Sequence, residues 1–144
     1  MIHIASYIDA DFIARLIRDE LGYTETTAEI VEKNLDMIIK DPHQVVLVID
    51  DEVGFIHVQL VDSLYSEPSA RIISFAVDGK FQGQGFGKKL LQAAEDWVKE
   101  QGRDFIILSS STYRHASHRF YEKQAYQATR QQKLFVKKIS IKGN

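Results

Sequence analysis

Hydrophobic residues return every three or four positions in the first part of the chain, a spacing typical of helices with one apolar face. A first helix is predicted after Asp9, which can serve as its N-terminal cap, and Gly22 is placed to end it. A second helix is predicted to open at the capping box of residues 26–29 and to stop at Asp41-Pro42. The predicted apolar faces comprise Phe12, Ile13, Leu16, Ile17 and Leu21 in the first helix, and Val31, Leu35 and Ile38 in the second.

Shorter apolar runs predict strands before, between and after the helices. Residues 1–5 form a first short strand, and the wholly apolar residues 45–49 are typical of a strand covered on both faces. Residues 54–61 alternate, and the tight turn at residues 50–52 predicts that they pair antiparallel with the preceding strand. A polar loop over residues 62–70 leads to a further strand over residues 71–77.

The second half of the chain is predicted to hold one long helix, one short helix and two more strands. The long helix carries Leu90, Leu91, Ala94, Trp97 and Val98 on one face, and Gly102 closes it. A buried strand follows over residues 105–108, then a helix near residues 117–123 and a final strand over residues 133–139. One more short strand near residues 126–129 is an open alternative. The order predicts a mixed α/β fold with helices around one sheet.

Composition narrows the class of protein. The 144 residues predict one domain over residues 1–144, and 44% hydrophobic residues suffice for a core. A net charge of −2 disfavours a nucleic-acid binder, and the absence of cysteine removes disulfides and thiol chemistry. No apolar run or signal-peptide pattern indicates a membrane or an export signal, so a soluble cytoplasmic protein is expected. His3, His43 and His57 lack the spacing of metal ligands, so no metal is predicted.

The most informative segment is a glycine-rich turn, Gln82-Gly83-Gln84-Gly85-Phe86-Gly87, between a predicted strand and a predicted helix. Glycine lets the main chain turn tightly and approach a ligand closely. The following helix adds unpaired N–H groups and the positive end of its dipole, so the turn can hold a diphosphate. A sharp strand-to-helix turn without a ligand would explain one glycine more readily than three.

Two phosphate-binding motifs do not fit this turn. The dinucleotide fingerprint G-x-G-x-x-G fails because its third glycine would fall at Lys88 or Leu90. The G-x-x-x-x-G-K-[ST] motif fails because Gly87-Lys88 is followed by Lys89, with Gln82 five positions before Gly87. The pattern that fits is Q/R-x-x-G-x-G/A, which resembles the acetyl-coenzyme A loop of the GNAT superfamily of N-acetyltransferases.

The resemblance extends beyond the loop. The strand, turn and helix over residues 73–91, and the later segment Phe120-Tyr121-Glu122-Lys123-Gln124-Ala125-Tyr126, resemble GNAT motifs in order and spacing. The resemblance implies a central, mostly antiparallel mixed sheet with helices on both faces, and acetyl-CoA as cosubstrate. It assigns acetyl-CoA binding to Phe75, Ala76, Val77, Gln82, Gly83, Gln84, Gly85, Phe86, Gly87 and Lys88.

The same resemblance implies N-acetyl transfer to a primary amine of a small molecule or a peptide, by direct attack in a ternary complex. The strand before the loop would pair with the pantetheine arm, and an N–H near Ala76 or Val77 would support the oxyanion. Tyr121 would be the acid that protonates the departing thiolate. The alternative for Tyr121 is a half-buried aromatic side chain with a satisfied hydroxyl.

The general base is left open. Many GNAT members have a glutamate where this chain has Ser74, and serine is too weak a base to deprotonate an ammonium group. Three further candidates are His118, Glu67 and Asp62, each also explained as a surface or structural residue. Two other departures from the family pattern are Arg114 in place of an asparagine and Ala125 in place of a glycine.

The amine acceptor is also left open. The segment from Arg114-His115 through His118 to Tyr121 resembles aminoalkylphosphonate N-acetyltransferases, which would suit an anionic acceptor, but a polar helix face explains it more simply. By the resemblance, residues 21–27 and 62–68 would form the acceptor wall.

Two competing functions remain: a non-catalytic acyl-CoA-binding module, favoured by Ser74, and a nucleotide-binding protein, disfavoured by the failed motifs. The alternating Lys133–Lys142 stretch suits either a lysine-protected edge strand or a strand at a homodimer contact, and the lysines favour the first.

Overall fold

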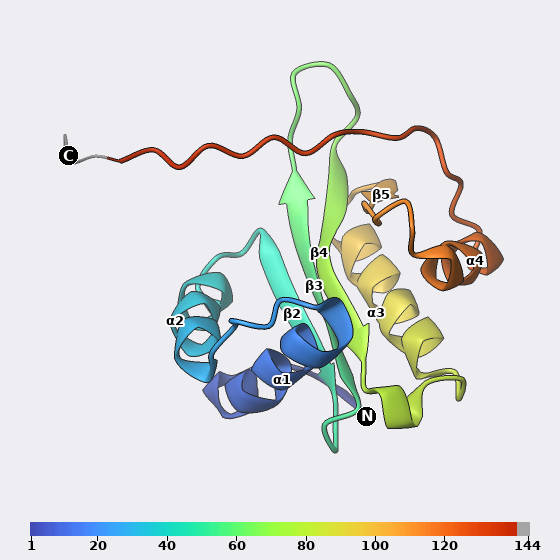
Figure 1. The fold of residues 1–144 in the computed structure, drawn as a ribbon. Coiled ribbons are helices and arrows are strands. Elements are labelled where there is room, and N and C mark those ends of the chain that lie inside the picture. Colours follow the sequence, from blue (N-terminus) through green and yellow to red (C-terminus); the bar gives the residue numbers. More distant parts are fainter. Residues whose placement is uncertain (141–144) are drawn as a thin grey trace. The chain divides into compact units, whose positions relative to one another are not determined.

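The computed structural model describes residues 1–140, and the chain divides into two compact units, residues 1–109 and residues 110–144. The first unit is built around one sheet with the strand order β1-β2-β3-β4-β5 (Figure 1). Its strands are β1 (Ile2–Ile4), β2 (Gln44–Ile49), β3 (Gly54–Val61), β4 (Ser69–Val77) and β5 (Phe105–Ile107). Neighbours pair antiparallel except β4 and β5, which are parallel. This confirms the predicted mixed, mostly antiparallel sheet.

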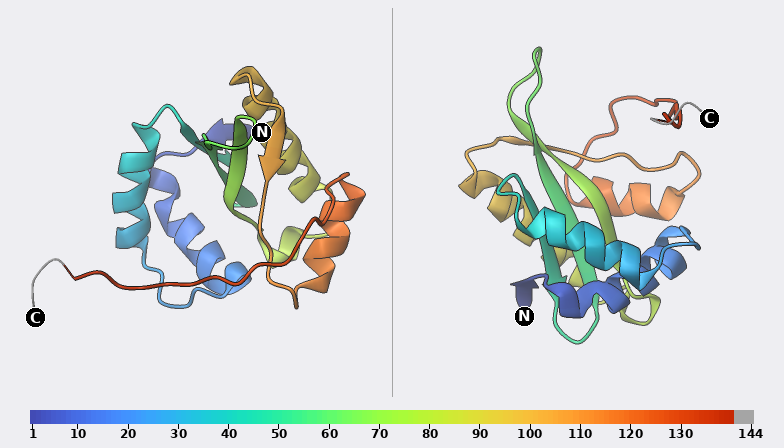
Figure 2. Two further views of the ribbon diagram at one scale, coloured as in Figure 1. Left: turned by 90° about the horizontal axis from the view of Figure 1, so that it is seen from above. Right: turned by 90° about the vertical axis from the view of Figure 1, so that its left-hand side faces the viewer.

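Helices cover both faces of the sheet, as predicted (Figure 2). The helices α1 (Ala10–Leu21) and α2 (Ala28–Ile39) lie on one face, and α3 (Phe86–Glu100) lies on the other. On the first face, apolar side chains of the two helices pack on inward-facing residues of the sheet, among them Val46, Val48 and Phe55. Burial of this apolar stripe, at about 25 cal/mol per Å², is the main stabilisation of the unit.

Both predicted helix starts hold to within a residue, but their caps differ from the prediction. Asp9 offers no side-chain cap to α1, because its carboxylate accepts from the Ser6 N–H at 3.0 Å and so closes the preceding 3-10 turn. The α2 cap is Thr27, one residue later than the box of residues 26–29 requires, and its hydroxyl accepts from Ile30 N–H at 3.2 Å.

The turn between β2 and β3 has the geometry that antiparallel neighbours require. Asp51 and Glu52 both have positive φ, at 67° and 58°. Two consecutive left-handed residues match the right-handed twist of the flanking strands, as in a type I′ hairpin. The prediction of a tight turn and antiparallel pairing is confirmed.

The strand β5 differs from the prediction of a buried strand. Phe105 is 55% exposed and Ile107 is 43% exposed. The reason is the place of β5 at the end of the sheet, where it pairs only with β4 and where one of its faces is left uncovered within residues 1–109.

Over its described residues, 110–140, the second unit contains one helix, α4 (His115–Lys123), which starts two residues before the predicted helix. The predicted final strand over residues 133–139 and the alternative strand near residues 126–129 are wrong, because residues 126–140 form neither helix nor strand. Alternation indicates a strand only where a neighbouring strand supplies hydrogen bonds, and sequence alone does not reveal that neighbour. The last part of the Lys133–Lys142 stretch lies outside the described residues.

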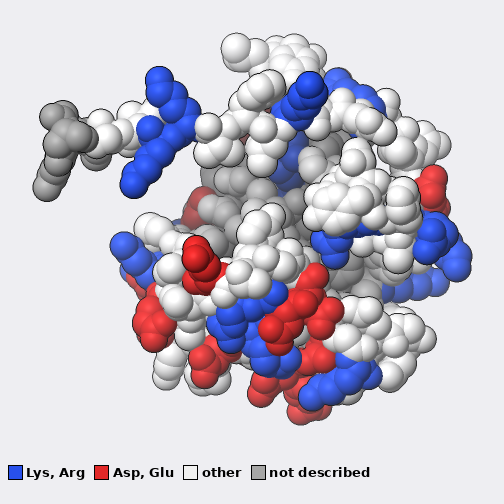
Figure 3. Space-filling model, in the orientation of Figure 1, with Lys and Arg blue, Asp and Glu red and all other residues white. Residues whose placement is uncertain are grey.

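Charges on the face shown in Figure 3 are mixed, with Lys and Arg side chains lying among Asp and Glu side chains. Within residues 1–140, no helix is long and apolar enough to cross a membrane.

Candidate functional site

The glycine-rich turn leaves β4 through a short 3-10 helix, Gly79–Phe81, and enters α3 (Figure 1). Gly83 has φ 78° and Gly85 has φ 87°, so both lie in the left-handed region that side chains with a Cβ rarely adopt. A Cβ at either position would meet nothing within 4 Å, so the space beside them is open. Gly87 lies in the first turn of α3, so only two of the three glycines serve the left-handed geometry.

Main-chain N–H groups of the turn are left without acceptors. Among the described residues, none accepts a hydrogen bond from the N–H groups of residues 83–88. The first N–H of the helix to be satisfied is that of Lys89, which donates to Gly85 O at 3.2 Å. These donors lie at the positive end of the α3 dipole, where an anion is stabilised.

Two aromatic rings and two lysines support the turn. Phe81 and Phe86 pack edge to face with ring centroids 6.0 Å apart. The Nζ atoms of Lys80 and Lys89 lie 5.6 Å and 5.5 Å from the centroids of Phe81 and Phe86, respectively. The edge-to-face pair joins the residue before the turn to one within it, and each ring has a lysine ammonium group over it.

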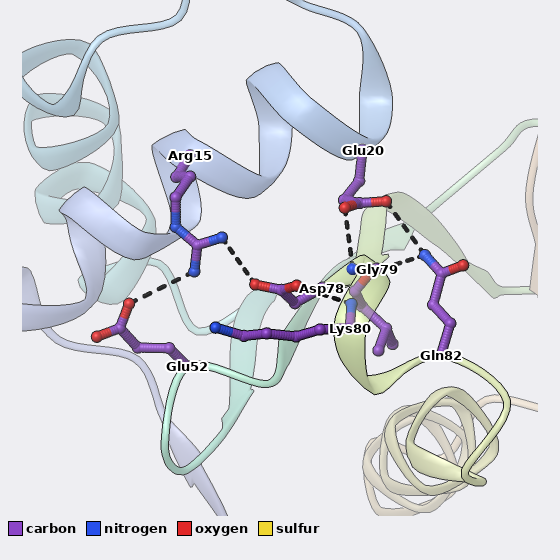
Figure 4. Close-up of polar contacts among 8 residues, drawn as sticks. Arg15, Glu20, Glu52, Asp78, Gly79, Lys80 and Gln82 are labelled. Carbon is purple, nitrogen blue, oxygen red and sulfur yellow. Dashed lines mark hydrogen bonds and ion pairs between the residues drawn. The ribbon is translucent and has the colours of Figure 1, made fainter.

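The turn is anchored to α1 through Asp78, the residue that follows β4 (Figure 4). Asp78 is 7% exposed, and Arg15 Nη1 donates to its Oδ2 at 2.7 Å, while the Lys80 N–H donates to its Oδ1 at 3.1 Å. The Arg15 hydrogen bond, followed by the Lys80 N–H, holds the pKa of Asp78 below its ordinary value. Arg15 also reaches Glu52 at 3.5 Å, which ties the β2–β3 turn to the same helix.

The strand β4 changes its pairing midway. Its parallel ladder with β5 ends at Arg71 and Ile107. Its register with β3 then shifts: His57 pairs with Ser74 and Val58 pairs with Ile72, so Ile73 is an extra residue. Bulges of this kind bend a strand and re-aim its side chains. Beyond Arg71, β4 runs outside the ladder with β5 until it reaches the turn.

The predicted pantetheine-contacting residues Phe75, Ala76 and Val77 occupy this last part of β4. The end of β4 leads through the 3-10 helix into the glycine-rich turn, so these predicted positions and the turn are consecutive parts of the chain. Ala76 is buried against the α1 and α2 face. The Val77 carbonyl accepts from Gln82 Nε2 at 3.0 Å, which closes the connection between strand and turn.

His57 is a residue of the site region that sequence reasoning missed. It lies directly across from Ser74 in the β3–β4 register and on the face covered by α1 and α2. Its Nε2 is 2.8 Å from Gln44 Oε1, and burial lowers the pKa of His57 to about 4, so the ring is neutral at pH 7. Alternation along residues 54–61 placed His57 on the polar side of the strand, but only the strand register brings it to Ser74.

Tyr121 lies on α4 in the second unit, where Phe120 and Tyr126 flank it. The ring centroids are 5.4 Å and 5.9 Å from that of Tyr121. Burial raises the pKa of the Tyr121 phenol, and the charge of Arg114 opposes this shift to a smaller extent. The phenol is therefore protonated at neutral pH, the state that a proton donor requires.

Of the other three candidate bases, two have hydrogen-bond partners within the protein and one is exposed to solvent. Asp62 is paired with Arg103 Nη1 at 2.9 Å, a structural contact that also includes the carbonyls of Val61 and Ser69. His118 Nε2 is 2.9 Å from the Ser111 carbonyl. Glu67 is exposed in the β3–β4 loop.

Arg114 and His115 begin α4, and the rings of His115 and His118 pack edge to face at 5.9 Å. Within residues 1–140, no three His, Asp or Glu side chains are arranged to hold a metal ion.

Comparison with known proteins identifies the family. The model of the acetyltransferase (GNAT) family matches residues 10–126. The uncharacterized N-acetyltransferase YhdJ of Bacillus subtilis (strain 168) is 45% identical over 40 residues, a match that spans 28% of each chain.

Solved structures share the fold at low sequence identity. A transcriptional regulator from Bacillus halodurans C-125 is 23% identical with a TM-score of 0.86, over 94% of this chain and 98% of that one. AAC(6')-Iy in complex with the bisubstrate analogue CoA-S-monomethyl-acetylneamine is 15% identical with a TM-score of 0.81, over 96% and 98% of the two chains. The family match over residues 10–126, together with the turn and the sheet, shows that this chain belongs to the acetyltransferase (GNAT) family.

Proposed function

We propose that this protein transfers the acetyl group of acetyl-CoA to a primary amine of a small molecule or a peptide, by direct attack in a ternary complex. The observation that carries the proposal is the run of main-chain N–H groups at residues 83–88, which have no acceptor among the described residues and lie at the start of α3. Membership of the GNAT family supports acetyl-CoA as the anion-bearing ligand.

The donor would lie along β4 and the turn. The N–H groups of residues 83–88 would hold the diphosphate, since successive main-chain donors at a helix N-terminus suit that anion. The amides of the pantetheine arm would pair with Phe75 to Val77, where β4 runs outside its ladder with β5. This placement would set the thioester near the middle of the sheet, beside the bulge at Ile73.

Transfer would then proceed in one addition and one elimination. The neutral amine adds to the thioester carbonyl carbon, and the developing oxyanion accepts from a main-chain N–H near Ala76 or Val77. The tetrahedral intermediate collapses, the carbon–sulfur bond breaks, and the departing thiolate takes the proton of the Tyr121 hydroxyl. The surplus proton of the amine leaves to a base or to solvent, and Tyr121 regains a proton from solvent.

One acetyltransferase domain over residues 1–144 is part of the proposal. The family match begins within α1 of the first unit and ends after α4 of the second, at residue 126, which supports a single functional unit.

The amine acceptor is tested with a panel. It contains aminoglycosides, because AAC(6')-Iy was solved with an acetylneamine analogue, and aminoalkylphosphonates, because of the segment from Arg114 to Tyr121. Polyamines and peptides with free amino groups complete it. Release of free thiol from acetyl-CoA, followed with a thiol reagent, reports turnover for each amine, and calorimetry with coenzyme A reports donor binding separately.

Each result of this experiment leads to one conclusion. Donor binding with amine-dependent thiol release supports the proposed enzyme. Binding without thiol release above background for any amine favours the second candidate, a non-catalytic acyl-CoA-binding module, which Ser74 in place of the common glutamate supports. If coenzyme A does not bind, both the enzyme and the acyl-CoA-binding module are excluded.

A further inference from the structure

Glu20, in the last turn of α1, contacts the first residue of the short 3-10 helix that leads into the glycine-rich turn and the residue that follows this helix (Figure 4). Its Oε2 accepts from the Gly79 N–H at 3.0 Å, and its Oε1 accepts from Gln82 Nε2 at 3.1 Å. The two contacts join residues that are 59 and 62 positions apart in the sequence. One carboxylate therefore holds the beginning and the end of the segment 79–82.

The contact is close on the main-chain side. A Cβ added at Gly79 would meet Glu20 Oε2 at 3.2 Å, tighter than most contacts of a real Cβ. Glycine at this position lets the carboxylate approach the main-chain N–H directly. Gln82 is held from two sides, since its Nε2 also donates to the Val77 carbonyl at 3.0 Å. Both hydrogens of this amide are used inside the protein.

Glu20 is half-buried and carries a negative charge on the same segment that leads to the anion-binding N–H groups. A carboxylate repels a diphosphate, so direct contact with the donor is not its role. Its two oxygens instead satisfy donors of the protein, and hydrogen bonds to an ionised acceptor are stronger than neutral ones. They fix the direction in which the main chain enters the turn.

We propose that Glu20 is a positioning residue for donor binding: by bridging Gly79 and Gln82, it preorganises the N–H groups of residues 83–88 for the diphosphate of acetyl-CoA. The inference rests on the proposed function. Order imposed before binding reduces the entropy that the ligand must remove, so affinity depends on a residue that the ligand does not touch.

The substitution Glu20→Gln separates this role from simple electrostatics, because the two predict opposite signs. Loss of one negative charge near an anion site would by itself tighten the binding of coenzyme A. The isosteric amide, however, turns an NH2 group toward either Gln82 Nε2 or the Gly79 N–H, so one of the two hydrogen bonds is lost. Positioning therefore predicts weaker binding.

The experiment measures the dissociation constant of coenzyme A by calorimetry for the full chain and three variants. Glu20→Gln and Glu20→Ala are each expected to raise it about tenfold, the factor that corresponds to about 1.4 kcal/mol. Asp19→Asn is the matched control, because it removes the same charge from the neighbouring, exposed position of α1. It is expected to leave the constant within about twofold.

Two further readouts separate positioning from a general loss of structure. The KM for acetyl-CoA should rise in Glu20→Gln while the kcat at saturating donor stays within about twofold, as expected when binding alone is affected. With S-acetylpantetheine, which lacks the diphosphate, Glu20→Gln and the unchanged protein should have the same kcat/KM. In the double variant Glu20→Ala/Gln82→Ala, the effects of the two single changes on coenzyme A binding should be less than additive.

Unchanged or tighter coenzyme A binding by Glu20→Gln would overturn the inference and leave the proposed function intact. The same holds if Asp19→Asn weakens binding as much as Glu20→Gln does, or if S-acetylpantetheine turnover falls equally. Absence of coenzyme A binding by the unchanged protein would overturn the proposed function itself, so the two failures are distinguishable.

Discussion

The start of α3 and the end of α4 each use a left-handed residue, but they leave their polar groups in opposite states. At the start of α3, Gly85 has φ 87° and the N–H groups around it have no acceptor among the described residues. At the end of α4, Ala125 has φ 70°, and main-chain N–H groups that follow the helix donate to carbonyls of its last turn. The Tyr126 N–H donates to Tyr121 O at 3.0 Å, and the Ala125 N–H donates to Glu122 O at 3.1 Å, which is a Schellman motif.

The difference teaches how a helix terminus is recognised as a binding site. A left-handed residue alone marks only a turn, because it occurs at both ends. Satisfied carbonyls at the end of α4 indicate that the turn serves the helix itself, so the role proposed for the neighbouring Tyr121 rests on its side chain. Unsatisfied N–H groups around Gly85 are main-chain donors at a helix N-terminus, so the binding role proposed for this region rests on its main chain.

The largest expected effect is on kcat, and it tests the role proposed for the Tyr121 side chain. Tyr121→Phe removes the proposed acid and should lower kcat by about 100-fold or more, with the KM for acetyl-CoA changed little. Burial raises the pKa of Tyr121, so the unchanged protein has a protonated phenol across neutral pH. Steady-state kinetics with the best amine of the panel measure the effect. An unchanged kcat would reduce Tyr121 to a structural aromatic residue.

A second test concerns His57, which lies across from Ser74 and whose pKa is lowered by burial. The pKa of His57 is about 4 in the folded chain and about 6.5 when unfolded, so the unfolded chain binds more protons between these values. The His57 contribution to stability is therefore full above pH 6.5 and is lost as pH falls toward 4, by at most about 3 kcal/mol.

Urea unfolding of His57→Gln from pH 7 to pH 4 should show a smaller decline in the free energy of unfolding than the unchanged protein. His43→Gln, at an exposed histidine, is the matched control and should keep the full decline. Parallel curves for His57→Gln and the unchanged protein would mean that the ring is solvated in the folded state.

The main-chain half of the comparison is tested at Gly85. Gly85→Ala forces a Cβ into a left-handed conformation and should raise the KM for acetyl-CoA about tenfold, besides lowering stability by about 1 kcal/mol. Gly102→Ala imposes the same kind of strain at φ 75° near the other end of α3, again with open space around the added Cβ. Gly102→Ala should lower the free energy of unfolding by about the same amount as Gly85→Ala and leave the KM for acetyl-CoA unchanged. Equal KM values for the two variants would contradict a binding role for the turn.

The smallest effect is a gain in stability. Ala125→Gly relieves the left-handed alanine at the end of α4 and should raise the free energy of unfolding by about 1 kcal/mol, because glycine is the preferred residue at this cap position. Urea unfolding measures the gain, and kcat/KM should stay constant. A loss of stability would show that the entropy that glycine adds to the unfolded chain outweighs the relieved strain.

Features that depend on neighbours in the sequence were predicted well. The helix spacing of Phe12, Leu16 and their partners, the strand over residues 54–61 and the turn at residues 82–87 all agree with the structure. The errors concern groups for which the pattern did not identify the hydrogen-bond partner. The cap at Asp9 failed because its carboxylate bonds back to Ser6, and the strand over residues 133–139 failed because alternation does not supply a pairing neighbour.

The amino-acid sequence by itself determined the glycine turn, the elements that flank it and the resemblance to an acetyltransferase family, because backbone conformation and periodicity are local properties. Tertiary structure alone decided that His57 lies across from Ser74 and that Glu20 holds the segment 79–82. Strand register brings His57 to Ser74, and the packing of α1 brings Glu20 to a segment that lies 59 to 62 positions later in the chain. No local pattern records such contacts.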